Sequence, residues 1–143
     1  IMGGEVHVDA ISHDNGSSRQ LLFRTYASGS AYTSSNYQYG YLTGYATPAG
    51  AENTGTDNVP FHPDSNNSST QWTGVIRFAN MRTTGVVEGT TQSRRTGQTS
   101  TLSKHIVWTN HGAAAEGTRL YWSGAGNFDA GVVRYFGVRA RTT

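Results

Sequence analysis

Cysteine is absent from the 143 residues of this chain, and proline occurs only three times. Without cysteine the chain can form neither a disulfide nor a zinc site built on thiolates, so core packing or association between subunits must hold the fold. No apolar run approaches the ~20 residues of a membrane-spanning helix, so membrane insertion is not expected.

Charged side chains are also scarce, at 14% of the sequence against a typical value of about 25%. Glycine, serine and threonine are plentiful instead, so hydroxyl and amide groups must make up most of the polar surface. Aromatic residues reach 11% and are spread along the chain, which is not the composition of a disordered protein. A length of 143 residues predicts a single domain, 1–143, with one core.

The hydrophobic pattern has the two-residue period of β-strands along most of the chain. In segment 72–79, for example, Trp72, Ile76 and Phe78 share one face. We expect strands at 5–10, 21–26, 37–45, 72–79, 84–91, 102–109, 118–122 and 132–138, and almost no helix. About eight strands with this spacing predict an all-β protein, an antiparallel β-sandwich with a jelly-roll-like arrangement.

Two polar stretches interrupt this pattern. Residues 47–69 form a long segment in which only Val59, Pro60 and Phe61 are suited to anchor on a core, and residues 92–100 form a shorter linker. A connection of more than about 15 residues without regular structure is uncommon in a compact domain and often carries function. We therefore expect surface loops at both places.

The five histidines are scattered and form no recognised metal or catalytic motif. His7 and Asp9 are two residues apart on an expected strand, and His13 and Asp14 follow closely, so this group is a candidate for metal ligation from one face. The further ligands that such a site needs have no fitting spacing, and polar residues on a solvated edge strand explain the same pattern. We expect no metal, no cofactor and no enzymatic activity.

Tyrosines gather on one face of an expected strand, at Tyr37, Tyr39, Tyr41 and Tyr45. Exposed tyrosine and tryptophan rings stack on sugar rings, so these residues, together with Trp72, are candidates for a glycan platform. The alternative is that they cover the core or a subunit interface, where a large ring with one polar tip is favourable. We favour the core or an interface.

Charge is unevenly divided along the sequence. Residues 1–70 hold six acidic and two basic side chains, whereas residues 71–143 hold nine basic and three acidic ones. Oppositely charged surfaces would direct subunit assembly, with Arg94, Arg95, Arg139 and Arg141 as candidate interface residues. The alternative, which we favour, is that strands from the two halves interleave and the charges balance locally. Nucleic-acid binding is not expected, because lysine is nearly absent and no recognition element is present.

The stretch 118–138 has the most distinctive pattern in the chain. Two strand-like runs flank a centre, 123–131, that contains Gly124, Gly126 and Gly131. Glycine accepts backbone angles that other residues resist, so this pattern predicts a hairpin with a glycine-rich connection. Phe128 lies inside this polar connection, and we expect its ring to be buried at the end of the core and held there by Gly126 and Gly131.

Gly126-Asn127-Phe128, then Gly131, then a strand that ends in two aromatic residues and Gly137 make up a recognisable signature. It resembles the last hairpin of a β-sandwich domain found in structural proteins of tailed bacteriophages. A looser match lies upstream, where residues 21–24 are followed by Asn36 and Tyr37. The ending differs from the family's usual Leu-Tyr-Gly, because residues 135–137 read Tyr-Phe-Gly here.

The resemblance implies a virion protein on the outer surface of a phage particle, assembled as a homotrimer and in contact with other virion proteins. We expect a tail-fibre or tail-spike domain for host attachment, with a host-surface glycan among its partners. The alternatives are a capsid decoration protein that stabilises the head shell and a carbohydrate-binding module.

Overall fold

The computed structural model describes residues 3–27, 30–31, 37–43, 49–62, 70–79, 85–96, 102–111 and 115–138. The elements in these ranges are β-strands: β1 (Gly3–His13), β2 (Leu21–Ala27), β3 (Ser30–Ala31), β4 (Tyr37–Thr43), β5 (Ala49–Thr56), β6 (Val59–Pro60), β7 (Trp72–Ala79), β8 (Gly85–Arg95), β9 (Leu102–His111), β10 (Gly117–Trp122) and β11 (Phe128–Val138). The described part of the chain contains no helix with the length and apolar character needed to span a membrane.

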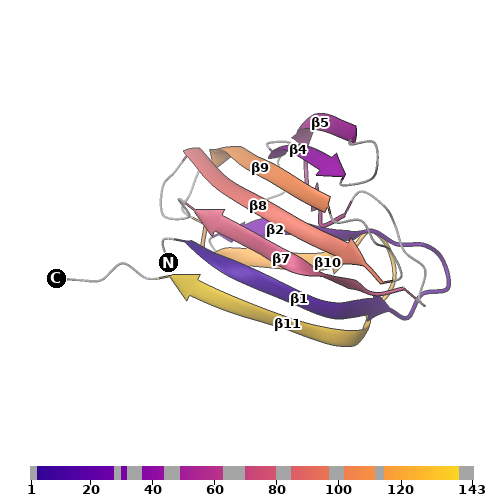
Figure 1. The fold of residues 1–143 in the computed structure, drawn as a ribbon. Coiled ribbons are helices and arrows are strands. Elements are labelled where there is room, and N and C mark those ends of the chain that lie inside the picture. The colour runs from indigo at the N-terminus through magenta and orange to yellow at the C-terminus, as the bar shows by residue number, and fades with distance from the viewer. Residues whose placement is uncertain are drawn as a thin grey trace.

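The strands form two antiparallel sheets that pack face to face as a sandwich (Figure 1). The larger sheet has seven strands in the order β11-β1-β7-β8-β9-β4-β5. In the smaller sheet, β2 lies between β10 on one side and the short strands β3 and β6 on the other. The expectation of an all-β antiparallel sandwich is confirmed.

The first and last strands of the domain are neighbours in the larger sheet. β1 pairs with β11 on one side and with β7 on the other, so that Val6 lies opposite both Tyr135 and Ile76. β11 and β5 form the two edges of this sheet. The fold therefore depends on pairing between segments that are far apart in the sequence.

The core lies between the two sheets and is built from side chains that alternate along their strands. Val6 and Val8 of β1 are buried, as are Trp72, Ile76 and Phe78 of β7. In β2, adjacent residues on both faces are buried, which confirms that this strand is internal. The buried cluster consists of Val6, Val8, Ile11, Leu21, Phe23, Tyr37, Val59, Phe61, Trp72, Ile76, Phe78, Ala115 and Trp122.

The two expected loops contain regular structure. Segment 47–69 includes β5 and β6, so the expectation of one long loop is wrong there, although Val59 and Phe61 are fully buried as anchors. Phe61 is fixed by hydrogen bonds to both sheets, because its N–H donates to the Leu21 carbonyl and its carbonyl accepts from the Ser93 hydroxyl. The expected linker at 92–100 is also shorter, because β8 continues to Arg95.

Candidate functional site

The segment between β10 and β11 crosses from one sheet to the other. β10 pairs with β2 in the smaller sheet, whereas β11 pairs with β1 in the larger one, and the two described strands do not pair with each other. The expected hairpin is therefore wrong, and the connection is an arch. The reason is that Leu120 and Val133 face each other across the space between the sheets, so these strands meet through side chains rather than through backbone hydrogen bonds.

A second crossing, residues 14–20 between β1 and β2, lies beside the arch and holds it. Asn127 donates hydrogen bonds from its backbone N–H and its side-chain amide to the Asp14 carboxylate, over 2.8 and 2.9 Å. The Ser123 N–H donates to the Gln20 carbonyl, and the Gln20 N–H donates to the Ser123 hydroxyl, each over 2.9 Å. The bonds from Asn127 favour the charged carboxylate and lower the pKa of Asp14.

Glycine is required near the start of β11, at the fourth residue of the strand. Gly131 has a φ of +95°, and β1 opposite it has an irregularity between Asp9 and Ser12 in which Ala10 adopts a φ of +53°. A Cβ atom on Gly131 would lie 2.5 Å from the carbonyl oxygens of Asp9 and Ala10. Gly126 also has a positive φ, of +149°. Both glycines therefore adopt angles that side chains resist, as expected for this centre.

Phe128 is half-exposed rather than buried, which contradicts the expectation for its ring. Its exposed fraction is 46%, and its ring packs against Trp122 with a centroid separation of 5.5 Å. Trp122 fills the end of the core instead, where it also contacts the buried ring of His13 at 4.8 Å. Phe128 is reached by solvent because it begins an edge strand, and among the described residues no strand lies on its outer side.

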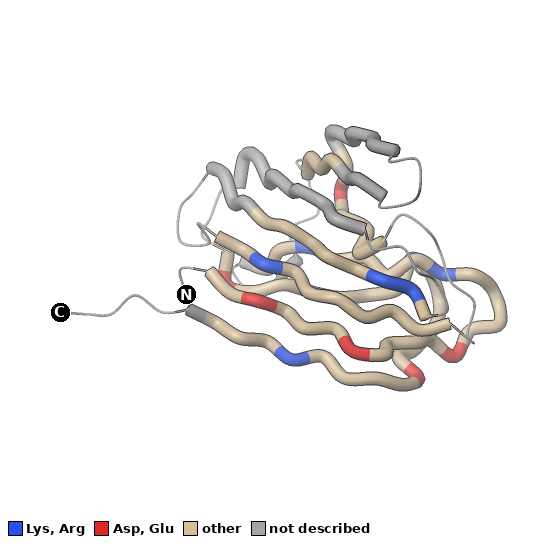
Figure 2. The backbone as a smooth tube through the Cα atoms, in the orientation of Figure 1, with Lys and Arg blue, Asp and Glu red and all other residues tan. Residues whose placement is uncertain are grey.

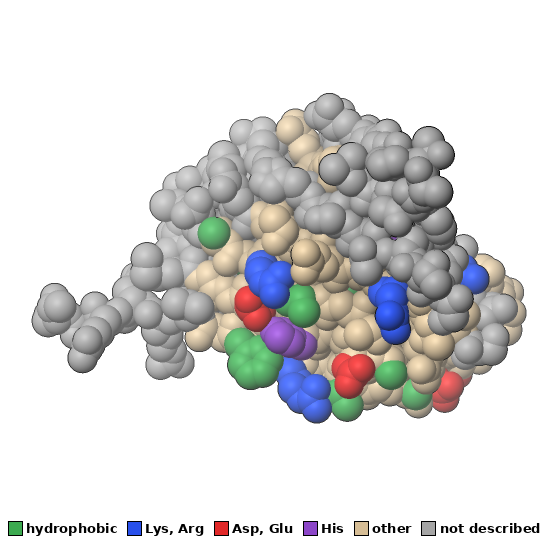
Figure 3. Space-filling model, in the orientation of Figure 1, with side chains coloured by type: hydrophobic (Ala, Val, Ile, Leu, Met, Phe, Trp, Pro, Cys, Tyr) green, Lys and Arg blue, Asp and Glu red, His purple; other side chains and the backbone are tan. Residues whose placement is uncertain are grey.

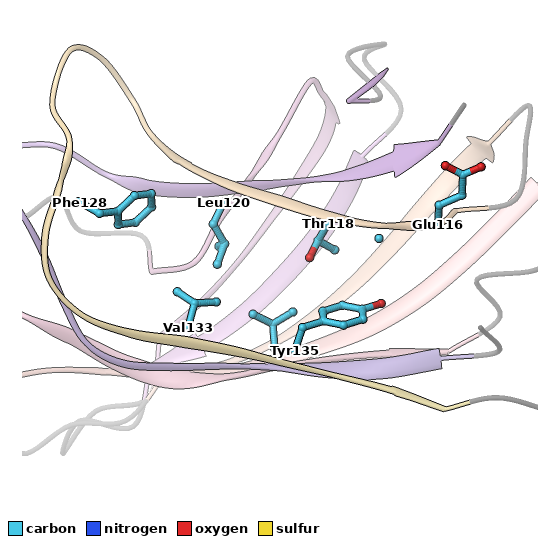
Figure 4. A pocket seen from close by; sticks show the side chains of 8 residues that line it. Glu116, Thr118, Leu120, Phe128, Val133 and Tyr135 are labelled. Atoms are coloured by element: carbon cyan, nitrogen blue, oxygen red, sulfur yellow. The ribbon is translucent and has the colours of Figure 1, made fainter. Parts of the chain in front are cut away.

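An apolar groove, here termed the edge groove, opens between the two sheets along β10 and β11 (Figure 4). Its volume is about 490 Å³. Val133 and Tyr135 point into it from β11, facing Leu120 and Thr118 on β10, and Phe128 lies at the end of the groove next to the arch. The complete lining is Val6, Glu116, Gly117, Thr118, Leu120, Phe128, Val133 and Tyr135. The groove is therefore an open side of the sandwich, with a carboxylate at one end.

The β11 strand exposes large hydrophobic side chains on both of its faces. Five of them are between 41% and 52% exposed: Phe128, Val132, Val133, Tyr135 and Phe136. Soluble proteins usually protect an edge strand by making it short or by placing lysine or proline on it. β11 has 11 residues and contains neither, and its only charges are Asp129 and Arg134. This edge has the character of a contact surface rather than of a solvated one.

Polar and aromatic side chains lie together on the outward face of the larger sheet (Figure 3). Arg77 Nε donates to Glu5 Oε1 over 2.8 Å, and His7 Nε2 lies 2.7 Å from Glu5 Oε2. Both contacts lower the pKa of Glu5, and the hydrogen bond with His7 has the larger effect. The ring of Phe136 meets the His7 ring edge to face, with centroids 5.0 Å apart. An exposed aromatic ring is thus surrounded by groups that form hydrogen bonds.

The acidic and basic halves of the sequence interleave in the fold. β1 comes from the acidic half and lies between β7 and β11 from the basic half, so opposite charges occur on neighbouring strands (Figure 2). Glu5 and Arg77, which form an ion pair, are an example from β1 and β7. Local balance of charge, the alternative favoured from the sequence, is confirmed for these strands.

The tyrosine stripe belongs to the core where it is described. Tyr37 is fully buried, and its hydroxyl lies 3.1 Å from the Thr25 N–H and 3.0 Å from the Thr25 hydroxyl, so it joins β4 of one sheet to β2 of the other. Trp72 is also fully buried, and Tyr39 packs against the core. A glycan platform that includes Tyr37 and Trp72 is therefore wrong. The side chain of Tyr41 and the whole of Tyr45 lie outside the described residues.

Two of the four arginines expected at an interface are described. Arg94 and Arg95 are the last residues of β8; Arg94 is exposed, and Arg95 is half-buried with an enclosed Nε that has no hydrogen bond. Arg139 and Arg141 lie outside the described residues. An interface role for these four arginines stays a prediction.

The candidate metal ligands near the N-terminus do not share a site. β1 is an internal strand rather than the solvated edge strand considered from the sequence, and His13 is completely buried against Trp122. His7 is on the outward face with Glu5. Across the described ranges, no three histidine, aspartate or glutamate residues group closely enough to hold a metal ion.

The sequence matches no protein-family model, and comparisons with curated proteins and with solved structures find no similar protein.

Proposed function

We propose that this chain is a structural domain of a tailed-phage particle, a tail-fibre or tail-spike domain that helps the particle attach to its host. The resemblance in residues 126–137 supports this role. The structural observation that carries it is the apolar edge formed by β10 and β11. An isolated strand edge of this kind promotes aggregation in a free monomer, whereas in an assembled particle a neighbouring protein covers it.

The domain would act through its surfaces rather than through chemistry. A sandwich of two sheets is a rigid support, and one edge is suited to assembly while the outward sheet face remains open. On that face, Phe136 next to His7 and Arg134 offers an aromatic ring for stacking and polar groups for hydrogen bonding. This combination favours a host-surface glycan as the ligand of the exposed face, in place of the buried Tyr37 and Trp72.

A glycan array tests this ligand class. We expect a labelled domain to bind a subset of bacterial-surface glycans, and Phe136→Ala to abolish the binding. Thr90→Ala is a matched control, because Thr90 is an exposed residue of the same sheet, in β8, two strands further from the edge than β1. Equal loss in both variants, or no binding by the wild-type domain, would remove the glycan from the proposal.

A capsid decoration protein is the second candidate, because the same apolar edge would serve to bind a head shell. Antibody labelling of intact particles under the electron microscope separates the two roles. Label on the tail is the result we expect, and label on the head would replace attachment by decoration. Particles that lack the chain altogether would refute both roles.

A further inference from the structure

We propose that the β10–β11 edge is a twofold contact between two copies of this chain, in which β11 pairs antiparallel with β11 of the second copy. The proposal rests on the role of this edge as a contact surface, given above. It does not depend on where the protein lies in a particle.

The first argument is the two-sided apolar character of β11. A partner that covered only one face would leave either Val132 and Phe136 or Val133 and Tyr135 in water. A strand that continues the sheet lies beside the side chains of both faces at once, provided that it is apolar on both faces itself, and it leaves the sheet face above Phe136 open. β11 is such a strand, and a twofold contact brings the same patch of each copy together.

The second argument is charge, which selects one register. The only charges on β11 are Asp129 and Arg134, five residues apart and opposite in sign. When the copies run antiparallel about a twofold axis between residues 131 and 132, Asp129 of each copy lies opposite Arg134 of the other. Two cross-strand pairs of opposite charge result, and the interface is electrostatically complementary to itself.

The third argument is that this register places residues opposite each other that lie on the same face of the sheet. It places Phe128 opposite Tyr135 of the second copy, and both residues line the edge groove. The positive φ of Gly131 then lies next to the twofold axis, so both copies bend at the same point. The two edge grooves face each other, and the four rings close them into one apolar interior.

Sedimentation equilibrium with charge reversal tests the contact. We expect the wild-type domain at micromolar concentration to have twice the 15.4 kDa mass of one chain. Arg134→Glu places two negative charges opposite each other in both cross-strand pairs. It should raise the dissociation constant about tenfold or more. Asp129→Arg should do the same, and the double variant Asp129→Arg/Arg134→Glu should restore the dimer. Gln92→Glu, which adds a negative charge at an exposed position of β8, is the control and should leave the mass unchanged.

Several results would overturn the proposal. These are a monomer at every concentration, a mass of three chains as expected from the phage resemblance, or a dimer that resists charge reversal at both positions. Circular dichroism establishes that each variant is folded before its mass is interpreted. The dimer is tested by mass, whereas the proposed function is tested by antibody labelling. One of the two can therefore be refuted while the other stands.

A pair of cysteines tests the register separately. The chain has no cysteine, and the register places Ala130 opposite Val133 of the second copy. Ala130→Cys/Val133→Cys should therefore form a covalent dimer on mild oxidation. The two new cysteines of one chain are about 10 Å apart along an extended strand and too distant to bond to each other. A wild-type dimer whose cysteine variant stays uncrosslinked would refute this register.

Discussion

Replacing Gly131 by alanine should destabilise the domain, because the junction between β1 and β11 leaves no room for a Cβ atom. The φ of +95° is strained for any residue with a side chain, at a cost of roughly 1–3 kcal/mol. The new Cβ would also lie 2.5 Å from two backbone carbonyl oxygens, those of Asp9 and Ala10. Backbone cannot move aside as a flexible side chain does, and overpacking of this kind adds about 1–3 kcal/mol.

The free energy of unfolding should therefore fall by about 2–6 kcal/mol. For a domain of this size, 1 kcal/mol shifts the melting temperature by about 3 °C, so thermal denaturation followed by circular dichroism should show a decrease of roughly 6–18 °C. Gly16→Ala is the control, since a Cβ there meets nothing within 4 Å and the φ of Gly16 is outside the strained region. If Gly131→Ala has the same melting temperature as this control, the close approach of β1 and β11 at Gly131 is wrong.

Three further predictions concern single side chains. Tyr37→Phe removes the contacts of its hydroxyl with the Thr25 N–H and hydroxyl that join the two sheets, and urea denaturation should show a loss of about 1–3 kcal/mol; an unchanged midpoint would contradict this. Phe128→Ala should cost only about 1–2 kcal/mol in dilute solution, because the ring is half-exposed, and a loss of the ~3–5 kcal/mol typical of a buried ring would show that it is enclosed. The lowered pKa of Asp14 stabilises the fold above the ordinary carboxyl value of 3.8, so the difference in urea midpoint between wild type and Asp14→Asn should shrink as the pH falls below that value. If the difference in urea midpoint did not change with pH in the acid range, the hydrogen bonds from Asn127 would not stabilise the charged form of Asp14.

The sequence was most informative for strands in which one face is buried, because buried apolar residues then alternate with exposed polar ones. Trp72, Ile76 and Phe78 predicted the extent and the buried face of β7, and the apolar run at 21–26 predicted the position of β2. Local alternation contains this information because successive side chains of a strand point to opposite faces. It says nothing about which strand lies alongside.

The errors follow from that limit. β5 is a polar edge strand with the sequence AGAENTGT, so no hydrophobic period distinguishes it from a loop. The choice between a hairpin and an arch for residues 117–138 depends on whether β10 pairs with β2 or with β11, which is a contact between distant segments. The same arch leaves Phe128 at an open edge and gives Trp122 the place at the end of the core. The edge groove, which joins two sheets, could not be read from one segment.

Hydrogen exchange of the β11 amides is the most direct test of the claim that this edge is a contact between copies. The peptide covering residues 128–135 should exchange more slowly as the protein concentration rises, because pairing with the second copy protects its outward N–H groups. A peptide from β7, which is paired on both sides within one chain, is the internal reference and should not change. Slower exchange confined to β11 is the predicted result, and exchange at 128–135 that does not depend on concentration would contradict it.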